Sequence, residues 1–238
     1  MNETPKRILL KLSGEVLKGS QDQGICPQTC QKLAIAIKSL ADSGIQIGIV
    51  VGGGNFYRGA AGAASGMPRT PADHIGMIAT LMNGIAFKHA LEEVDCKAQV
   101  LSGLECPKAV EPYNWHKAME YLASGKIVIF VGGTGSPYFT TDTAAALRAS
   151  EIGADMLVKA TKVDGVYSKD PIQHADAQRY DRISYDKVLE EDLKVMDATA
   201  FALCRSSQIP ILVFNMDHLM TAKPVTISEI QKSGSLIY

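Results

Sequence analysis

The sequence has no long uninterrupted apolar run and no basic block. Its 238 residues are 46% apolar and carry a formal net charge of −1. The longest apolar runs fall far below the roughly 18 residues that a membrane-spanning helix needs, and charges stand at the N-terminus where a signal peptide would need an apolar segment. The missing basic block disfavours a general nucleic-acid-binding protein. We therefore expect a cytoplasmic protein that requires neither a membrane nor nucleic acid.

Cysteines are few and are not spaced in pairs. No two of the five form a C-x-x-C pattern: Cys26, Cys30, Cys96, Cys106 and Cys204. An odd number without paired spacing argues against both a disulfide framework and a zinc site. We expect these thiols to be buried or incidental.

The usual nucleotide-binding fingerprints are also missing. The chain has no G-x-x-x-x-G-K-[ST] motif, and the glycines of Gly52–Gly54 do not have the dinucleotide-binding spacing. No internal repeat or low-complexity tract is present. If the protein binds phosphates, it must use a loop of a different design.

One stretch of the chain combines features that suit a phosphate. Ile127–Val131 is a short β-branched run without alternation, as expected of a strand buried on both faces of a parallel sheet. Residues 132–142 then supply three glycines, three threonines and a serine, and a helix of high intrinsic propensity follows from Thr143. Glycines let the backbone approach a ligand closely, and the first N–H groups of a helix attract anions.

Strand-like and helix-like segments alternate along the whole chain. The expected strands are 8–12, 45–51, 98–101, 127–131, 156–160 and 211–215. The expected helices are 27–42, 73–92, 115–122 capped by Asn114, one from 143, 184–194 and 197–207, with a polar loop over 168–182. Such alternation predicts right-handed crossovers and one α/β domain: a three-layer α/β/α sandwich around a mostly parallel twisted sheet.

Polar residues collect at the ends of these expected strands. Lys11 lies at the carboxyl end of the first strand, and the runs Gly52–Asn55, Gly132–Asp142 and Thr161–Tyr167 each follow the carboxyl end of another strand. In open α/β sheets that edge is where ligands bind. One glycine-rich turn would be weak evidence, but four such segments together predict a ligand site.

At this point the motifs resemble those of the bacterial uridylate kinases, which belong to the amino acid kinase superfamily. The motifs are Lys11–Glu15, Gly52–Asn55 with Arg58, Asp73-His74, Gly133-Thr134-Gly135 with Phe139–Asp142, and Lys159–Tyr167. The likeness extends over almost the whole chain, in the same order, to Leu193–Asp197 and Phe214-Asn215. It implies the amino acid kinase fold over 1–238, with an N-terminal part that mainly binds a monophosphate and a part from about residue 156 that mainly binds ATP.

The resemblance implies reversible transfer of the γ-phosphate of ATP to UMP, which gives UDP and ADP for pyrimidine nucleotide synthesis. Lys11 would contact the transferring phosphoryl group, and the N–H groups near Gly53 and Gly54 would cradle the phosphates. We expect Lys162, ahead of Lys159, as a second cation, and Asp142 as the group that holds the lysines in place. A phosphate oxygen as nucleophile needs no deprotonation, so positioning and charge neutralisation suffice.

The same resemblance assigns two sets of binding residues. Those for UMP are Gly53, Asp73, Thr134, Gly135, Ser136, Pro137, Tyr138, Phe139, Thr140 and Thr141. Those for ATP are Lys11, Leu12, Ser13, Gly14, Gly54, Arg58, Thr161, Tyr167 and Asp170. Magnesium would be held mainly by the nucleotide phosphates and water, because such sites need few protein ligands. Each charged residue also has a structural alternative, such as a surface charge for Arg58 or a helix-start charge for Asp142.

The family also implies an assembly and regulation. The expected assembly is a homohexamer built as a trimer of dimers, with the long helix 73–92 at subunit contacts. Ile75, Ile78, Met82, Ile85 and Ala86 mark one face of that helix. Further apolar side chains, namely Met77, Leu81, Ile85 and Phe87, favour an interface, although a helix sandwiched between sheet and loop is the alternative.

This chain departs from the family pattern at a few positions. Ser136 stands where many uridylate kinases carry Asn, and Lys88-His89 stands where many carry Arg-Asp. The latter pair lies near the region that the family uses for GTP activation, and 19–24 is the corresponding effector loop, so a GTP response is an open question while UTP inhibition is expected.

Two other functions are considered. One is a non-catalytic nucleotide-binding or storage protein on the same fold, since function resides in the site rather than the fold. The other is a sister kinase acting on a carboxylate, carbamate or amino acid, which the 135–139 loop disfavours. Lys11, Asp142 and the paired lysines argue against lost activity.

Overall fold

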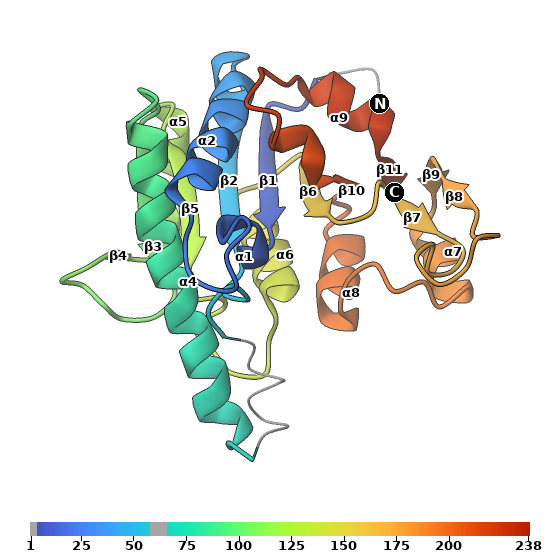
Figure 1. The fold of residues 1–238 in the computed structure, drawn as a ribbon, viewed down its shortest axis with the longest axis horizontal. Helices are drawn as coiled ribbons and strands as arrows, with labels where there is room; N and C mark the ends of the chain where they lie inside the picture. The colour runs from blue at the N-terminus through green and yellow to red at the C-terminus, as the bar shows by residue number, and fades with distance from the viewer. Residues whose placement is uncertain (1–3, 58–65) are drawn as a thin grey trace.

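The computed structural model describes residues 4–57 and 66–238. In this part a nine-stranded sheet has the order β4-β3-β5-β2-β1-β6-β10-β11-β9 (Figure 1). The strands are β1 (Arg7–Leu12), β2 (Gln46–Val51), β3 (Ala98–Ser102), β4 (Glu111–Pro112), β5 (Ile127–Val131), β6 (Met156–Thr161), β9 (Arg182–Ile183), β10 (Ile211–Asn215) and β11 (Ser235–Ile237). Neighbours pair in parallel except β10 with β11, and β7 (Val166–Tyr167) forms a separate antiparallel pair with β8 (Arg179–Tyr180). The expected mostly parallel sheet is confirmed.

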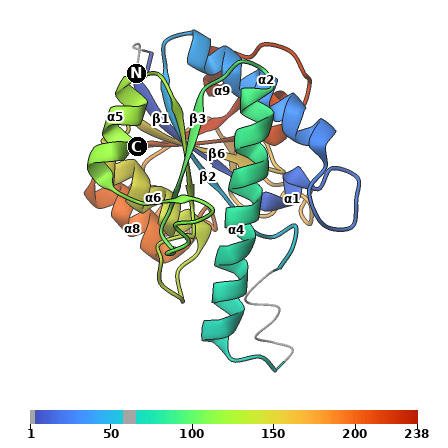
Figure 2. The same ribbon diagram turned by 90° about the vertical axis from the view of Figure 1, so that its left-hand side faces the viewer.

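Helices cover both faces of this sheet (Figure 2). One face carries α2 (Pro27–Asp42), α4 (Arg69–Glu92) and α9 (Ile227–Ser233), and the other carries α5 (Trp115–Ala123), α6 (Thr141–Glu151) and α8 (Ala198–Ser206). Short helices α1 (Gly14–Leu17), α7 (Tyr185–Glu190) and the 3₁₀ turn η1 (Met216–Leu219) complete the described elements. The three-layer α/β/α sandwich is therefore confirmed.

Strand alternation divides the interior into two apolar cores. In β1, Ile8 and Leu10 pack with the helices of the α2 side, whereas Leu9 packs with the helices of the α6 side. Successive side chains of a strand point to opposite faces, so a central strand with helices on both sides must be apolar almost throughout. This requirement explains the uninterrupted apolar runs that identified the central strands.

Most element boundaries agree with those expected from the sequence, but the boundaries in the C-terminal region differ from them. The bounds of α2, β5 and β10 are those expected, and Asn114 caps α5 by accepting a hydrogen bond from the N–H of Lys117 at 3.1 Å. The last strand was expected at 211–215, but α9 and β11 follow it. The polar 168–182 segment, expected as a loop, contributes β8, and the helix expected over 184–194 ends at Glu190.

The long helix α4 presents its apolar residues in two directions. Met77, Leu81 and Phe87 are buried in the core, so they do not supply the surface expected of them. The exposed apolar stripe consists of Ile75, Ile78, Met82 and Ile85. Close packing on the inner side decides this orientation, because a side chain at Gly84 would bring its Cβ within 2.3 Å of Val131.

Within the described residues, no helix combines the length and the apolar character needed to cross a membrane. The five cysteines are free thiols, and Cys30, Cys96 and Cys204 are buried. Burial raises the pKa of Cys204 to about 12, so this thiol is not a nucleophile at neutral pH.

Candidate active site

Two lysines and one aspartate form a compact cluster at the carboxyl edge of the sheet. Lys11 in β1 and Lys159 in β6 are direct neighbours in the parallel register. Asp142, in the first turn of α6, lies between their ammonium groups, with Oδ1 2.7 Å from Lys11 Nζ and Oδ2 2.6 Å from Lys159 Nζ. Lys159 Nζ also donates to the carbonyl of Val195 at 2.6 Å. The three side chains are only 12% to 15% exposed.

The electrostatics of this cluster favour an additional anion. Burial alone would raise the pKa of Asp142, but the ammonium groups of Lys11 and Lys159 outweigh it and hold the pKa below the ordinary value. Asp142 is therefore a carboxylate at neutral pH and a poor proton acceptor. Burial also lowers the pKa of Lys159, and Asp142 compensates only in part. Two cations sharing one carboxylate leave positive charge for a phosphoryl group.

The first glycine loop, 52–55, lies next to the turn that follows Lys11. A Cβ at Gly14 would lie 2.2 Å from the carbonyl oxygen of Gly52, so only glycine permits this approach. Among the residues that the structure describes, the N–H groups of Gly53 and Gly54 donate to no other group. Unpaired N–H groups beside a lysine are suited to phosphate oxygens.

The second glycine loop, 132–141, connects β5 to α6. Gly132, Gly133 and Gly135 have positive φ angles, and so does Tyr138 at +73°. The N–H of Tyr138 donates to Asp73 at 2.8 Å, which fixes this strained residue. Asp73 also pairs with Arg69 at 2.7 Å, so its carboxylate binds both the loop and the first turn of α4.

The predicted UMP residues mostly lie together along this loop. Thr134, Gly135, Ser136, Pro137 and Phe139 lie between β5 and α6, with Phe139 exposed, and Thr141 is the first residue of α6. Thr140 caps α6 by accepting hydrogen bonds from the N–H groups of Asp142 and Thr143. The loop thus leads directly from the exposed aromatic residues to the lysine cluster.

Three of the predicted ATP residues lie around a neighbouring cavity of about 610 Å³. Thr161, Tyr167 and Asp170 line it together with Lys159. The hydroxyl of Tyr167 donates to Asp164 at 2.6 Å, which lowers the pKa of that carboxyl. Ser13 caps α1. Leu12 is fully buried, so only its backbone could face a ligand.

Lys162, which the sequence predicted as the second cation, is not part of this cluster. The second lysine at Asp142 is Lys159, whereas Lys162 is 79% exposed and lies 3.2 Å from Glu15. Its proposed role as second cation stays a prediction. Arg58 lies outside the described residues.

Asp197 is a polar residue of this edge to which the sequence had assigned no role. Its carboxylate accepts hydrogen bonds from the hydroxyls of Thr140 at 2.5 Å and Thr143 at 2.9 Å, and from the N–H of Ala200 in α8. It therefore joins the second glycine loop to α8. An aspartate immediately before a helix is a capping signal, and this signal was available in the sequence.

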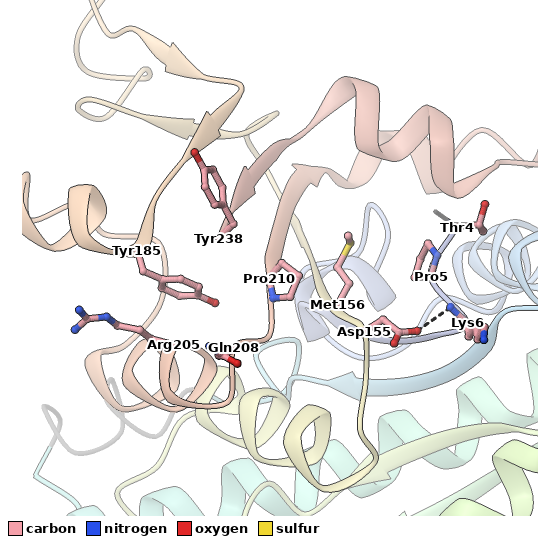
Figure 3. Close-up of a pocket in the computed structure, with 10 residues that line it drawn as sticks. All are labelled: Thr4, Pro5, Lys6, Asp155, Met156, Tyr185, Arg205, Gln208, Pro210 and Tyr238. Atoms are coloured by element: carbon pink, nitrogen blue, oxygen red, sulfur yellow. Dashed lines mark hydrogen bonds between the residues drawn. The ribbon is translucent and has the colours of Figure 1, made fainter. Parts of the chain in front are cut away.

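A second cavity, of about 890 Å³, lies at the opposite end of the sheet (Figure 3). Lys6, Met156 and Pro210 line it near the amino ends of β1, β6 and β10, and the rings of Tyr185 and Tyr238 close one side. It contains neither glycine loop nor the lysine cluster. The candidate active site is therefore the carboxyl edge, where ligands bind in open parallel sheets.

Comparisons with known proteins agree with this geometry. The family described as "Amino acid kinase family" matches residues 6–215. The uridylate kinase of Protochlamydia amoebophila is 61% identical over 237 residues, covering 100% of this chain and 94% of that protein. The uridylate kinase of Pseudomonas aeruginosa is 51% identical over 230 residues, covering 97% and 92%.

Solved structures agree as well. The crystal structure of UMP kinase from Ureaplasma parvum superposes with a TM-score of 0.90 at 36% identity, covering 99% of each chain. That of UMP kinase from Bacillus anthracis gives 0.89 at 32% identity, covering 99% and 96%. With matches over its full length in both sequence and structure, this chain belongs to the amino acid kinase family and, within it, to the uridylate kinases.

Proposed function

We propose that this enzyme transfers the γ-phosphate of ATP to UMP, forming UDP and ADP in pyrimidine nucleotide synthesis. The observation that carries the proposal is the Lys11–Asp142–Lys159 cluster, which lies between the 132–141 loop and the cavity beside β6. UMP would occupy the loop side and ATP the cavity side, so the N-terminal part would mainly bind the monophosphate and the part from residue 156 mainly ATP. The transferring group would then pass the two ammonium groups.

The cluster suits phosphoryl transfer without a general base. The attacking phosphate oxygen of UMP carries no proton that must be removed, so the enzyme has to align two anions and neutralise their charge. Lys11 and Lys159 supply the charge, and the N–H groups of Gly53 and Gly54 supply neutral donors. Asp142 orients both lysines through its two ion pairs. Its lowered pKa makes it a poor base.

ATP is proposed to act with Mg²⁺. Within residues 4–57 and 66–238, no group of three or more His, Cys, Asp or Glu side chains could hold a metal ion. Asp142, the carboxylate of the cluster, is already paired with two lysines. This donor set fits a metal held by nucleotide phosphates and water, as Mg²⁺ commonly is. Mg²⁺ would offset charge on the β- and γ-phosphates.

The substrate proposal is tested by ADP release from ATP and magnesium with UMP, CMP, dTMP, AMP, carbamate or aspartate offered separately. We expect strong turnover with UMP only. Turnover with carbamate or aspartate instead would indicate a sister kinase. ATP or UMP binding without turnover of any acceptor would indicate a non-catalytic nucleotide-binding protein.

We also propose a homohexamer built as a trimer of dimers, with α4 at a subunit contact. The support is the exposed stripe Ile75, Ile78, Met82 and Ile85, which is continuous along one side of a 24-residue helix. Apolar patches of this kind are rarely left in contact with water. Regulation by GTP and UTP is proposed as well, because Lys88 and His89 line a cavity of about 550 Å³ beside this stripe.

Replacing Ile78 with aspartate is expected to dissociate the assembly at micromolar concentration, because a carboxylate would be buried without a partner. Light scattering after size-exclusion chromatography gives the mass. Leu189→Asp is the matched control, since Leu189 on α7 is 51% exposed and Ile78 is 52% exposed. An Ile78→Asp variant with the mass of the wild type would exclude α4 from the contact.

A further inference from the structure

Asn83 is a fully buried polar residue on the inner side of α4. Its side chain is 0% exposed, and it points away from the exposed stripe of the same helix. A buried amide without partners is costly, so its hydrogen bonds indicate what the residue does. All of the hydrogen bonds described for this side chain lead to the first glycine loop or to the asparagine that ends it.

Asn83 and Asn55 form a reciprocal pair. Asn83 Nδ2 donates to Asn55 Oδ1 at 2.7 Å, and Asn55 Nδ2 donates to Asn83 Oδ1 at 2.8 Å. The second N–H of Asn83 donates to the carbonyl of Gly52 at 2.7 Å, and that of Asn55 donates to the carbonyl of Gly24 at 2.7 Å. Both amide groups therefore use both of their N–H donors.

These bonds hold the two ends of the loop that carries Gly53 and Gly54. Within the loop itself, Gly53 and Gly54 contribute N–H groups that have no partner in the described chain. A Cβ at Gly53 would lie 2.5 Å from the carbonyl oxygen of Gly76, so the loop lies directly against α4. Its shape depends on α4, because Asn83 reaches the start of the loop through Gly52 and its end through Asn55.

We propose that Asn83, acting through Gly52 and Asn55, is a positioning residue that keeps the 52–55 loop ready to bind phosphate. This inference rests on the proposed phosphoryl transfer, because it needs a phosphate at Gly53 and Gly54. Asn83 touches no reacting atom itself. A loop whose donors are fixed in advance avoids the cost of ordering them when the ligand arrives.

The same face of α4 holds the second glycine loop in a similar way. Thr80 Oγ1 accepts a hydrogen bond from the N–H of Gly132 at 2.7 Å and donates to the carbonyl of Met77. Thr80 and Asn83 are three residues apart and therefore lie on one side of the helix. Both glycine loops are therefore hydrogen-bonded to the same side of α4. This arrangement favours a role in positioning the loops over a role in packing alone.

The test uses Asn83→Ala, Asn55→Ala and the double variant in the full-length protein. Ser39→Ala is the matched control, because Ser39 also bridges distant segments through hydrogen bonds to both backbone groups of Val225. Ser39 lies in the last turn of α2, which leads to the amino end of β2, away from the glycine loops. Melting temperature is measured alongside UMP binding by calorimetry and steady-state turnover.

Each single Asn variant is expected to raise the Kd and the KM for UMP about tenfold, with a smaller fall in kcat. The reason is that the N–H groups of Gly53 and Gly54 would no longer be held in place for their hydrogen bonds to the charged phosphate, which are stronger than bonds between neutral groups. The double variant should differ from either single variant by no more than about twofold, because both remove the same reciprocal pair. Ser39→Ala should lower the melting temperature and leave the Kd unchanged.

Unchanged UMP binding in folded Asn83→Ala would overturn the inference, and so would a double variant whose effect is the product of the two single effects. If Asn83→Ala does not fold, Asn55→Ala probes the same pair from the loop side, and unchanged binding there is equally decisive. A wild type that binds UMP without turning it over would contradict the proposed function, whereas the binding comparison would still test Asn83.

Discussion

Replacing Lys11 with alanine is expected to lower kcat by about 10³-fold, the upper end of the loss that removal of a preorganised charge-stabilising donor causes in other enzymes. Lys11 is largely buried, lies at the end of the central strand and is 2.7 Å from Asp142. Its removal takes one of the two positive charges from the path of the phosphoryl group and leaves Asp142 with Lys159 alone. The loss should appear in kcat more than in KM, because charge develops in the transition state.

The measurement is steady-state UDP formation at saturating ATP and UMP, with equilibrium binding of both nucleotides measured in parallel. Lys38→Ala is the control, because Lys38 forms an ion pair with Asp42 on the surface of α2 and has no contact with the site. Turnover of Lys11→Ala within twofold of the wild type would remove Lys11 from the catalytic mechanism.

The second large effect is expected at Lys159. Lys159→Ala should lower kcat by at least about 10²-fold, because it removes the second ammonium group beside Asp142, which also donates to the carbonyl of Val195. Lys162→Ala should change kcat by less than about threefold, since exposed ion pairs contribute little. Lys162 is exposed and lies 3.2 Å from Glu15.

The pair of variants decides which lysine acts as the second cation. Each variant removes one ammonium group, and the two positions are three residues apart. A difference in kcat between the variants therefore cannot come from a difference in net charge. A larger loss in Lys162→Ala than in Lys159→Ala would mean that Lys162 moves to the phosphates when nucleotides bind. Intact melting temperatures, measured with ligand-free protein, exclude misfolding as the cause in either case.

The choice between these lysines shows where the sequence stops being sufficient. The Lys-x-x-Lys spacing is compatible with either residue facing the phosphates, because no residue near these lysines marks the end of the strand. In the structure β6 continues to Thr161 and pairs Lys159 with Lys11, which places both lysines in one row at the same edge. That register depends on pairing with β1, about 150 residues earlier in the chain, so it is set by the tertiary structure and not by the local sequence.

The orientation of α4 has a similar explanation. Apolar residues occur on nearly every side of this helix, so a period of 3.6 cannot identify the inner face. The inner face is set by Gly84, where no side chain would fit against Val131, and by the hydrogen bonds of Thr80 and Asn83. Short elements were missed for another reason: β11 has three residues and begins with a serine, which is too little for a periodic signal.

The strands, and the placement of Lys11 and Asp142 at their carboxyl edge, were predictable because their signals are local. Ile127–Val131 is apolar without alternation, and such a run is buried on both faces wherever helices cover a parallel sheet. Lys11 lies near the carboxyl end of β1, and α6 begins in the segment after β5, so any parallel arrangement brings them to one edge. The contact of Asp73 with Tyr138 was not predictable, because it joins a helix to a loop 65 residues away.

The attachment of several loops to α4 has a mechanical consequence. Tyr138, Gly132 and Gly52 are each bonded to this one helix, through Asp73, Thr80 and Asn83 respectively. A helix of 24 residues is a stiff rod of roughly 36 Å, so a small rotation about its axis displaces all three attachment points at once. We therefore expect the candidate site to tighten or loosen as a unit, and we expect a ligand or subunit that binds the outer stripe to change turnover without touching either substrate.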